Sequence, residues 1–281
     1  MIVGCGEWGF REMEIPEHFH IAKRFGFHYL EFGIGGGHPG RLSETLTQEQ
    51  ILAFKALGRE HAIKTPFCCI ENDFTLKDVD AHESMVERTT RSIRLAARCG
   101  ATHVRLFAGF TPADQMTEAT WKRMLQAFER CGAVCRGLGL QISIETHGAI
   151  EFHADGSAAH THSATTDPKC LARLVRELPR AIGFNYDPGN LKAVNPDDRT
   201  HALDLLDERI NYCHLKDWRR EGEGWVACAV GDDDLDYASL LKKMKFDGVY
   251  LIEYEPLADT EDGIRRSLEY LKKLNVDLRF A

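Results

Sequence analysis

The chain has 281 residues, of which 43% are hydrophobic and 28% charged, and this composition is ordinary for a globular protein. Its net charge of -8 disfavours a nucleic-acid surface, because phosphate backbones are bound by clustered Lys and Arg. No apolar run approaches the roughly 20 residues that cross a bilayer, so no membrane contact is expected. Residues 1–7 lack a secretory-signal pattern and the nine cysteines form no CxxC pair, so we expect a cytoplasmic protein with buried, reduced thiols.

Short apolar segments alternate along the chain with longer amphipathic segments, a pattern typical of buried strands and surface helices. We expect strands at Ile2–Cys5, Tyr29–Phe32, Lys64–Cys69, His103–Phe107, Gln141–Glu145, Ile182–Asp187, Ile210–His214 and Val249–Glu253. The clearest helices are expected at Asp80–Cys99, Ala113–Leu138, Asp167–Leu178, Tyr237–Met244 and Thr260–Leu274. A glycine stands before several strands, where a left-handed helix cap is usual: Gly26, Gly100, Gly139 and Gly248.

Strands that alternate with helices pair in parallel through crossover connections. Eight such units in a chain of this length match a closed (β/α)8 barrel, and we predict a single-domain TIM barrel over residues 1–281. An open, doubly wound sheet is the alternative. The Gly-rich segment 33–37 is interpreted as a flexible loop. The segment His147–Thr166 is interpreted as the longest irregular loop and a candidate lid.

Four consecutive predicted strands end in side chains that can bind a metal ion. The C-terminal strand ends of a parallel barrel share one face, and that face holds the active site of TIM-barrel enzymes. Period-two alternation turns each of the four side chains into the barrel, and neighbouring strands lie about 4.8 Å apart. One such carboxylate alone would be interpreted as a helix cap or an ion pair. Three buried carboxylates would repel one another without a cation, so we predict a joint metal site: Glu145, Asp187, His214 and Glu253.

The predicted site contains three carboxylates and one imidazole, so most of its ligands are oxygen atoms. Such a site suits Mn²⁺ or Mg²⁺ best, with Co²⁺, Fe²⁺ or Zn²⁺ as alternatives. Four protein ligands leave two positions of an octahedral ion free. Adjacent oxygens of a substrate, such as those of a hydroxyketone, can occupy these two positions.

The chain resembles, over nearly its whole length, the xylose-isomerase-like barrel superfamily of sugar isomerases and epimerases. This superfamily includes ketose 3-epimerases, hydroxypyruvate isomerase, inosose dehydratase and, more distantly, a metal-dependent apurinic endonuclease. The motifs that carry the resemblance are residues 26–31, Glu145-Thr146-His147, Asp187-Pro188-Gly189-Asn190, His214-Leu215-Lys216-Asp217, and the stretches 231–236 and 249–253. The resemblance implies that the four residues named above bind the metal. It also implies that Glu145 and Glu253 act as acid and base.

This resemblance implies isomerisation or epimerisation of a small carbohydrate through a metal-stabilised ene-diolate. No Gly-rich turn follows the last strand, which favours an unphosphorylated sugar or keto-sugar. An inosose-type dehydratase is the main alternative. An apurinic endonuclease and a non-catalytic sugar-binding barrel are weaker ones. Related barrels assemble as dimers or tetramers, so a homo-oligomer stays open.

Five further residues are expected to contact the substrate. His147 and Lys216 face inward by alternation, and Trp8 follows the first strand. Arg220 matches an arginine that contacts substrate in the epimerases. Asn190 stands where the epimerases and the endonuclease carry a histidine, so the pocket is expected to differ from both.

Several other polar residues are given weaker interpretations. Glu31 on the second strand is expected to be structural. Asp233 replaces the second glycine of a Gly-x-Gly turn, which is expected to be retained in a different conformation. His153, His160 and His162 resemble metal ligands by composition, but on an irregular loop we expect them to face solvent.

Overall fold

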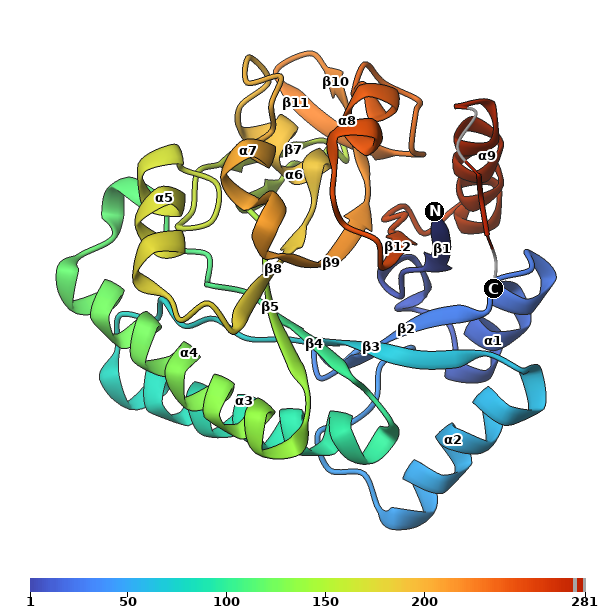
Figure 1. The fold of residues 1–281 in the computed structure, drawn as a ribbon, viewed down its shortest axis with the longest axis horizontal. Helices are drawn as coiled ribbons and strands as arrows, with labels where there is room; N and C mark the ends of the chain where they lie inside the picture. The colour runs from blue at the N-terminus through green and yellow to red at the C-terminus, as the bar shows by residue number, and fades with distance from the viewer. Residues whose placement is uncertain (275–276, 280–281) are drawn as a thin grey trace.

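The computed structural model describes residues 1–274 and 277–279, and its parallel strands form a closed barrel (Figure 1). The barrel strands are β1 (Ile2–Cys5), β2 (Tyr29–Ile34), β3 (Lys64–Ile70), β4 (His103–Leu106), β5 (Gln141–Glu145), β8 (Ile182–Tyr186), β9 (Ile210–Leu215) and β12 (Val249–Ile252). They follow one another around the barrel in chain order, and β12 closes on β1 through pairs such as Ile2 with Val249. The eight predicted strands and the predicted barrel are confirmed.

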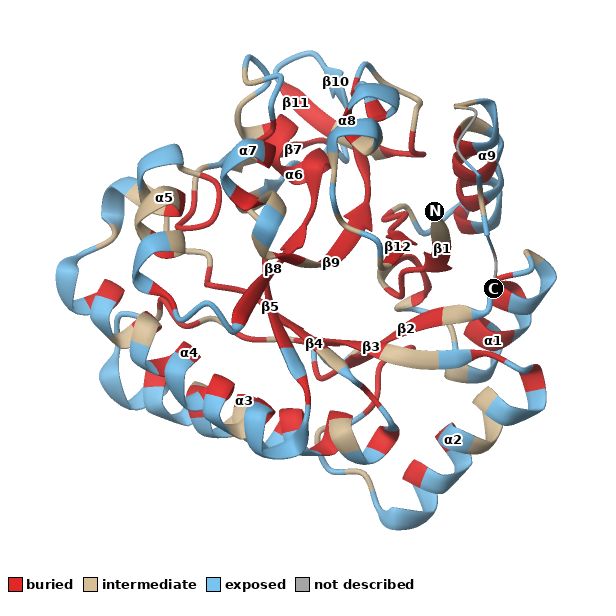
Figure 2. Cartoon of the chain, in the orientation of Figure 1, coloured by how far each residue is buried: buried red, intermediate tan, exposed pale blue. Residues whose placement is uncertain are grey.

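The helices lie outside the strands, and most have buried inner faces and exposed outer faces (Figure 2), whereas residues 188–193 are buried throughout. They are α1 (Ile15–Arg24), α2 (Gln48–His61), α3 (Val79–Cys99), α4 (Glu118–Leu138), α5 (Pro168–Glu177), α6 (Pro188–Val194), α7 (Leu203–Leu206), α8 (Tyr237–Lys243) and α9 (Thr260–Lys273). Short 3-10 turns lie at η1 (Trp8–Phe10), η2 (Ala113–Gln115) and η3 (Asp207–Arg209). Within the described ranges, no helix combines the length and the apolar character that crossing a membrane requires.

Capping residues explain where the long helices begin and end. The predicted helix Ala113–Leu138 is two elements, because the Thr117 side chain accepts the N–H of Thr120 and begins α4 there, after η2. Gly100 and Gly139 end α3 and α4 with φ of 105° and 70°, as expected for left-handed caps. The cap expected at Gly248 is wrong, because α8 already ends at Lys243 and Gly248 has no left-handed backbone.

Three glycines around the first strand allow it to pack closely against the last strand. Gly4, Gly6 and Gly9 have the spacing of a dinucleotide-binding fingerprint. A Cβ on Gly6 would lie 2.9 Å from the carbonyl oxygen of Ile252, and one on Gly9 would lie 2.2 Å from that of Tyr254. The glycines therefore serve barrel closure, and they bring η1 to the mouth of the barrel.

A second sheet follows the C-terminal ends of β5 and β9. The hairpin of β6 (Ala149–Phe152) and β7 (Ala158–Thr161) joins the hairpin of β10 (Asp217–Glu221) and β11 (Gly224–Cys228) through the pair Ala158–Trp225. The interpretation of His147–Thr166 as an irregular loop is therefore wrong. Trp218 and Trp225 lie in the β10–β11 hairpin, and they cover the apolar side of the β6–β7 hairpin.

An apolar layer fills the barrel below its C-terminal mouth. Phe67, Tyr212, Val249 and Leu251 form this layer, and the rings of Phe67 and Tyr212 lie 5.0 Å apart. Alternation along β9 and beyond β12 places the next inward-facing side chains two residues further on. The layer is thus the floor on which the polar side chains of the mouth rest.

Candidate active site

The side chains at the C-terminal ends of β5, β8, β9 and β12 come together inside the barrel. One donor atom from each of the four lies within 4.8 Å of the others: Glu145, Asp187, His214 and Glu253. None of these residues is more than 4% exposed. Because β8 and β9 lie between β5 and β12 in the barrel, Glu145 and Glu253 stand at the two ends of the row.

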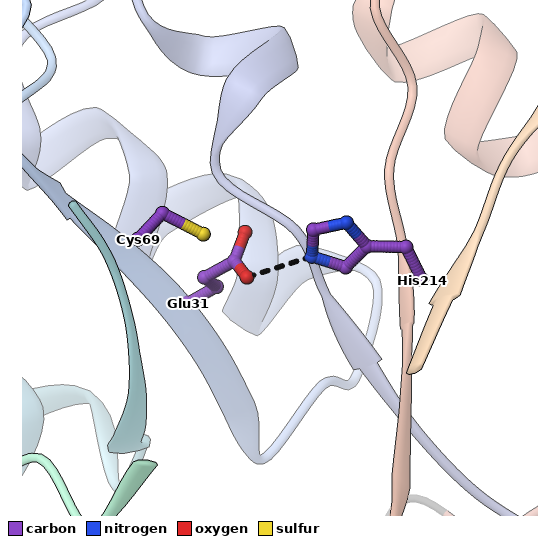
Figure 3. Close-up of side chains that lie close together, drawn as sticks. All are labelled: Glu31, Cys69 and His214. Atoms are coloured by element: carbon purple, nitrogen blue, oxygen red, sulfur yellow. Dashed lines mark hydrogen bonds and ion pairs between the residues drawn. The ribbon is translucent and has the colours of Figure 1, made fainter. Parts of the chain in front are cut away.

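His214 is oriented by Glu31, which reaches it from β2 across the barrel (Figure 3). The Nε2–H of His214 donates to Glu31 Oε1 over 2.8 Å, and the Tyr212 hydroxyl donates to the same oxygen over 2.5 Å. The Nδ1 atom of His214 therefore faces the Oε1 atoms of Glu145 and Glu253, at 3.6 and 3.4 Å. This ring nitrogen is the one that can bind a metal ion.

Three carboxylates lie close together at this site, and a divalent cation fits among them. Burial raises the pKa of Asp187 to about 8; the charge of Lys216 opposes this rise, and those of Glu145 and Glu253 add to it. A cation among the carboxylates would remove their mutual repulsion. Three carboxylates and one neutral imidazole nitrogen are ligands that Mn²⁺, Mg²⁺ or Zn²⁺ accept. The residues present therefore fit a divalent metal ion.

Arg105 on β4 lies beside Glu145, although sequence analysis did not single it out. The Nε atom of Arg105 is 2.9 Å from Glu145 Oε2, and both side chains are buried. Burial by itself would raise the pKa of Glu145, but the charges of Arg105 and His214 hold it below its ordinary value. The contact is an ion pair without hydrogen-bond alignment, and Glu145 Oε2 and Arg105 Nη1 have no hydrogen-bond partner. Unsatisfied buried atoms of this kind are places for a ligand.

A cavity of about 420 Å³ lies at the mouth of the barrel, and Glu145 and Glu253 form part of its wall. Its other charged residues are Glu71, Arg105, Lys216 and Glu255. Its apolar residues come from η1, β6 and the segment after β4. A larger surface hollow of about 690 Å³ lies around Arg180 and Lys243, and none of the four metal-capable side chains lines it. The smaller cavity is therefore the candidate substrate pocket.

Three of the residues expected to contact substrate line this cavity: Trp8, His147 and Lys216. Lys216 Nζ donates to Glu253 Oε2 over 3.0 Å and to Glu255 Oε1 over 2.5 Å. His147 Nδ1–H donates to the Gly148 carbonyl over 2.5 Å. This bond leaves the Nε2 atom of His147 as an acceptor, and burial lowers the pKa of His147.

The other two residues expected to contact substrate do not line the cavity. Asn190 is buried behind the metal-capable residues, where its Nδ2 donates to Asp187 Oδ2 over 3.0 Å and its Oδ1 accepts the Trp218 indole N–H over 3.2 Å. Arg220 is exposed on β10, and its Nε donates to the Gly222 carbonyl over 3.1 Å. The structure thus gives Asn190 a supporting position and turns Arg220 away from the pocket.

The histidines of the β6–β7 hairpin do not join the metal-capable residues. His153 is exposed, as expected. His160 is half-buried with its ring 4.4 Å from that of Trp218, and burial lowers its pKa to about 3. His162 is also half-buried. The expectation that all three face solvent is therefore wrong for His160 and His162, because the second sheet covers part of the hairpin.

The turn that carries Asp233 is held by a buried lysine. Gly231 keeps a positive φ of 88°, and its N–H donates to Asp217 Oδ2 over 3.2 Å. Lys192 Nζ on α6 donates to Asp217 Oδ1 over 3.1 Å and to Asp233 Oδ2 over 2.6 Å. Asp233 thus has a cationic partner, Lys192, which also binds Asp217.

Comparison with known proteins agrees with this architecture. The sequence profile of the xylose isomerase-like TIM barrel family matches residues 19–274, so the chain belongs to that family. Solved structures of the same fold include a D-tagatose 3-epimerase-like protein (TM-score 0.72, 16% identity, 98% of both chains) and the IolI protein with bound zinc (TM-score 0.74, 15% identity, 98% of both chains). Another is the probable 3-DHS dehydratase AsbF from Bacillus anthracis (TM-score 0.73, 13% identity, 97% of this chain and 99% of that chain). At these identities the likeness shows the fold alone, and no curated protein matches the sequence significantly.

Proposed function

We propose that the protein is a divalent-metal-dependent isomerase or epimerase of a small, unphosphorylated sugar or keto-sugar. The observation that carries this proposal is that two buried carboxylates, Glu145 and Glu253, stand at either end of a row of metal-capable donors and face one cavity. Two same-fold proteins, one described as epimerase-like and one solved with zinc, support this choice. We propose Mn²⁺ or Mg²⁺ as the metal, held by the four residues described above.

The metal would polarise the substrate carbonyl and make the adjacent C–H acidic. Glu145 and Glu253 then do the proton chemistry from opposite sides of the substrate. One carboxylate removes the proton next to the carbonyl, which leaves an ene-diolate, and the other returns a proton. Return to the same carbon from the other face gives epimerisation. Return to the neighbouring carbon gives isomerisation.

A cationic side chain lies beside each glutamate. Arg105 lies beside Glu145, and Lys216 donates to Glu253. The unpartnered Nη1 of Arg105 and the free Nε2 of His147 are proposed to bind substrate oxygens. Together they would hold the sugar with its reacting carbons between the two glutamates.

A dehydratase of the inosose type is the second candidate, because one same-fold protein is described as a probable dehydratase. Loss of a β-hydroxyl needs a proton donor for the leaving oxygen, and Lys216 is a cation at the cavity wall. An apurinic endonuclease and a non-catalytic sugar-binding barrel are weaker candidates. The net charge of -8 disfavours the first, and the two flanking glutamates disfavour the second.

Solvent exchange tests this proposal. The Mn²⁺-loaded protein is incubated in D₂O with a panel of ketoses and inososes, and the products are analysed by mass spectrometry and NMR. We expect deuterium on the carbon beside the carbonyl without loss of water. Glu145→Gln and Glu253→Gln should each lower the exchange rate by about 100-fold or more. Glu60→Gln, an exposed change on α2, should leave the rate unchanged.

Each other outcome selects a different function. A product lighter by one water would indicate the dehydratase. Sugar binding without exchange would indicate the non-catalytic barrel. Full exchange in either glutamine variant would contradict the acid and base roles.

A further inference from the structure

The cavity has two chemically different parts. Its innermost side chains are charged, among them Glu145 at 1% and Glu253 at 4% exposure. Its remaining wall carries six apolar side chains: Ala149 and five larger ones, which we name the aromatic rim, Trp8, Phe107, Phe110, Ile150 and Phe152. A monosaccharide carries hydroxyls around its ring and matches the inner part, but the rim offers it few polar partners.

Two rings of the rim are already packed as a platform. The ring centres of Phe107 and Phe110 lie 5.0 Å apart, and each also contacts the ring of His147, at 5.0 and 5.7 Å. The guanidinium of Arg105 lies 4.1 Å from the centre of the Phe107 ring. The platform is therefore held against Arg105 and His147, at the border of the charged part of the cavity.

Phe152, unlike the buried side chains of the cavity, is largely exposed to solvent. It ends β6, the outermost strand of the second sheet, and 67% of its surface is exposed. Alternation along β6 puts Phe152 on the same face as Ile150, and both line the cavity. Glu151, between them, faces away. Phe152 thus continues the apolar wall of the cavity from Ile150 out to its solvent-exposed entrance.

We propose that the aromatic rim binds an apolar, ring-shaped substituent of the substrate. The substrate would then be a keto-sugar joined to an apolar group, as in a glycoside with an aromatic aglycone, rather than a free sugar. This inference rests on the proposed function and narrows its substrate class. The cavity volume of about 420 Å³ supports it, because drug-sized ligands occupy pockets of roughly 300–1,000 Å³. The sugar would lie at the charged inner part and the aglycone against Phe152 and the platform.

The test compares two probes that differ only in the substituent, the methyl and phenyl glycosides of one keto-hexose. KM and kcat for solvent-deuterium exchange are measured with the Mn²⁺-loaded protein, and dissociation constants are measured by calorimetry. We expect the phenyl glycoside to bind about tenfold more tightly than the methyl glycoside, the size of effect that one stacked aromatic ring supplies. The preference should appear in KM and in the dissociation constant, because the rim does not touch the reacting carbons.

Three variants test whether Phe152 causes the preference for the phenyl glycoside. Phe152→Ala should remove most of the preference for the phenyl glycoside, through a higher KM and a higher dissociation constant for that probe. Phe152→Leu should restore part of it, because leucine keeps an apolar surface. Leu52→Ala, on the outer face of α2 and 52% exposed, should keep the full preference. These surface changes leave the barrel core intact.

The outcomes separate this inference from the proposed function. Exchange with both glycosides but equal binding would overturn the inference and leave the proposed function standing. Exchange with no sugar would remove the proposed function, while calorimetry with the phenyl glycoside would still decide whether the rim binds it. If Phe152→Ala converted an oligomer to a monomer in light scattering and kept the preference, the rim would be a contact between copies and the inference would be wrong.

Discussion

The two ring nitrogens of His214 have different partners, and this difference decides which of them can bind a metal. Nε2 donates to Glu31, whereas Nδ1 accepts the Asn185 Nδ2–H over 3.1 Å and faces Glu145 and Glu253 at 3.6 and 3.4 Å. Metal-binding histidines usually donate their second N–H to a carboxylate, which fixes the tautomer and the ring orientation. Glu31 is thus a positioning residue that acts through His214.

Replacing Glu31 with glutamine should weaken metal binding without removing any of the four proposed ligands. The amide is a poorer acceptor for the Nε2–H, so we expect the dissociation constant for Mn²⁺ to rise about 10- to 100-fold. Calorimetric titration of the metal-free protein measures this constant, and circular dichroism checks the fold. Glu60→Gln is the matched control. Unchanged affinity in Glu31→Gln would show that Glu31 only packs.

Arg105 and Glu31 show which residues of the site a sequence pattern can identify and which it cannot. Arg105 lies on the same face of β4 as His103 and Phe107, so the alternation that selected the other residues could also have found it. Glu31 lies in the middle of β2, where a strand-end search does not look. No pattern along the chain links Glu31 to a histidine 183 residues away.

At the scale of elements, His18 ties α1 to the segment that precedes it. Its Nε2–H donates to the carbonyls of Phe10 over 2.9 Å and Met13 over 3.2 Å. Burial lowers the pKa of His18 from 6.5 to about 4, although the two backbone bonds oppose this change. The folded protein therefore holds His18 neutral where the unfolded chain would protonate it. The start of α1 depends on that neutral ring.

This pKa difference predicts acid-sensitive stability. Because the folded pKa is depressed, the contribution of His18 is complete above about pH 6.5 and is lost as the pH falls toward about 4, a change of about 3 kcal/mol. Urea unfolding of the wild type and of His18→Gln, which cannot titrate, measures it. The wild type should lose stability relative to the variant as the pH falls through this range. A stability difference that did not change with pH would rule out this role.

The second sheet shows why some elements escape sequence analysis. The segment after β5 contains His, Ala, Ser and Thr and carries no strong strand signal. It becomes the β6–β7 hairpin because Trp218 and Trp225 from the β10–β11 hairpin cover it. Long helices such as α3 and α4 were predictable, because their caps and periodicity lie within the segment itself.

For the whole molecule, a metal that binds only the folded barrel must stabilise it. At a free metal concentration 100 times the dissociation constant, the gain is about 2.7 kcal/mol. For a chain of this size, that raises Tm by roughly 5 °C. Calorimetric melting of the metal-free protein with and without Mn²⁺ or Mg²⁺ measures the shift. A Tm that neither ion changes would contradict a metal site in this barrel.

Asp187→Asn adds a second test of the metal site. It should stabilise the metal-free fold but reduce the further stabilisation that metal gives. Burial raises the pKa of Asp187 to about 8, so its ionised form destabilises the metal-free fold. The amide removes that charge and keeps an oxygen that can accept the Asn190 N–H. We expect the metal-free variant to melt at or above the wild-type temperature, and to show little further rise when metal is added.

The sequence by itself determined the barrel, its strands and the residues at the strand ends. These features are local: hydrophobic period, helix caps and alternation act within a few residues of one another. Tertiary structure alone decided that Glu31 orients His214, that Arg105 lies beside Glu145, and that two hairpins join into a second sheet whose strand β6 lines the cavity. It also turned Arg220 outward and placed Asn190 behind the metal-capable residues. Such contacts join positions far apart in the chain, so closure of the barrel, rather than any sequence pattern, sets their distances.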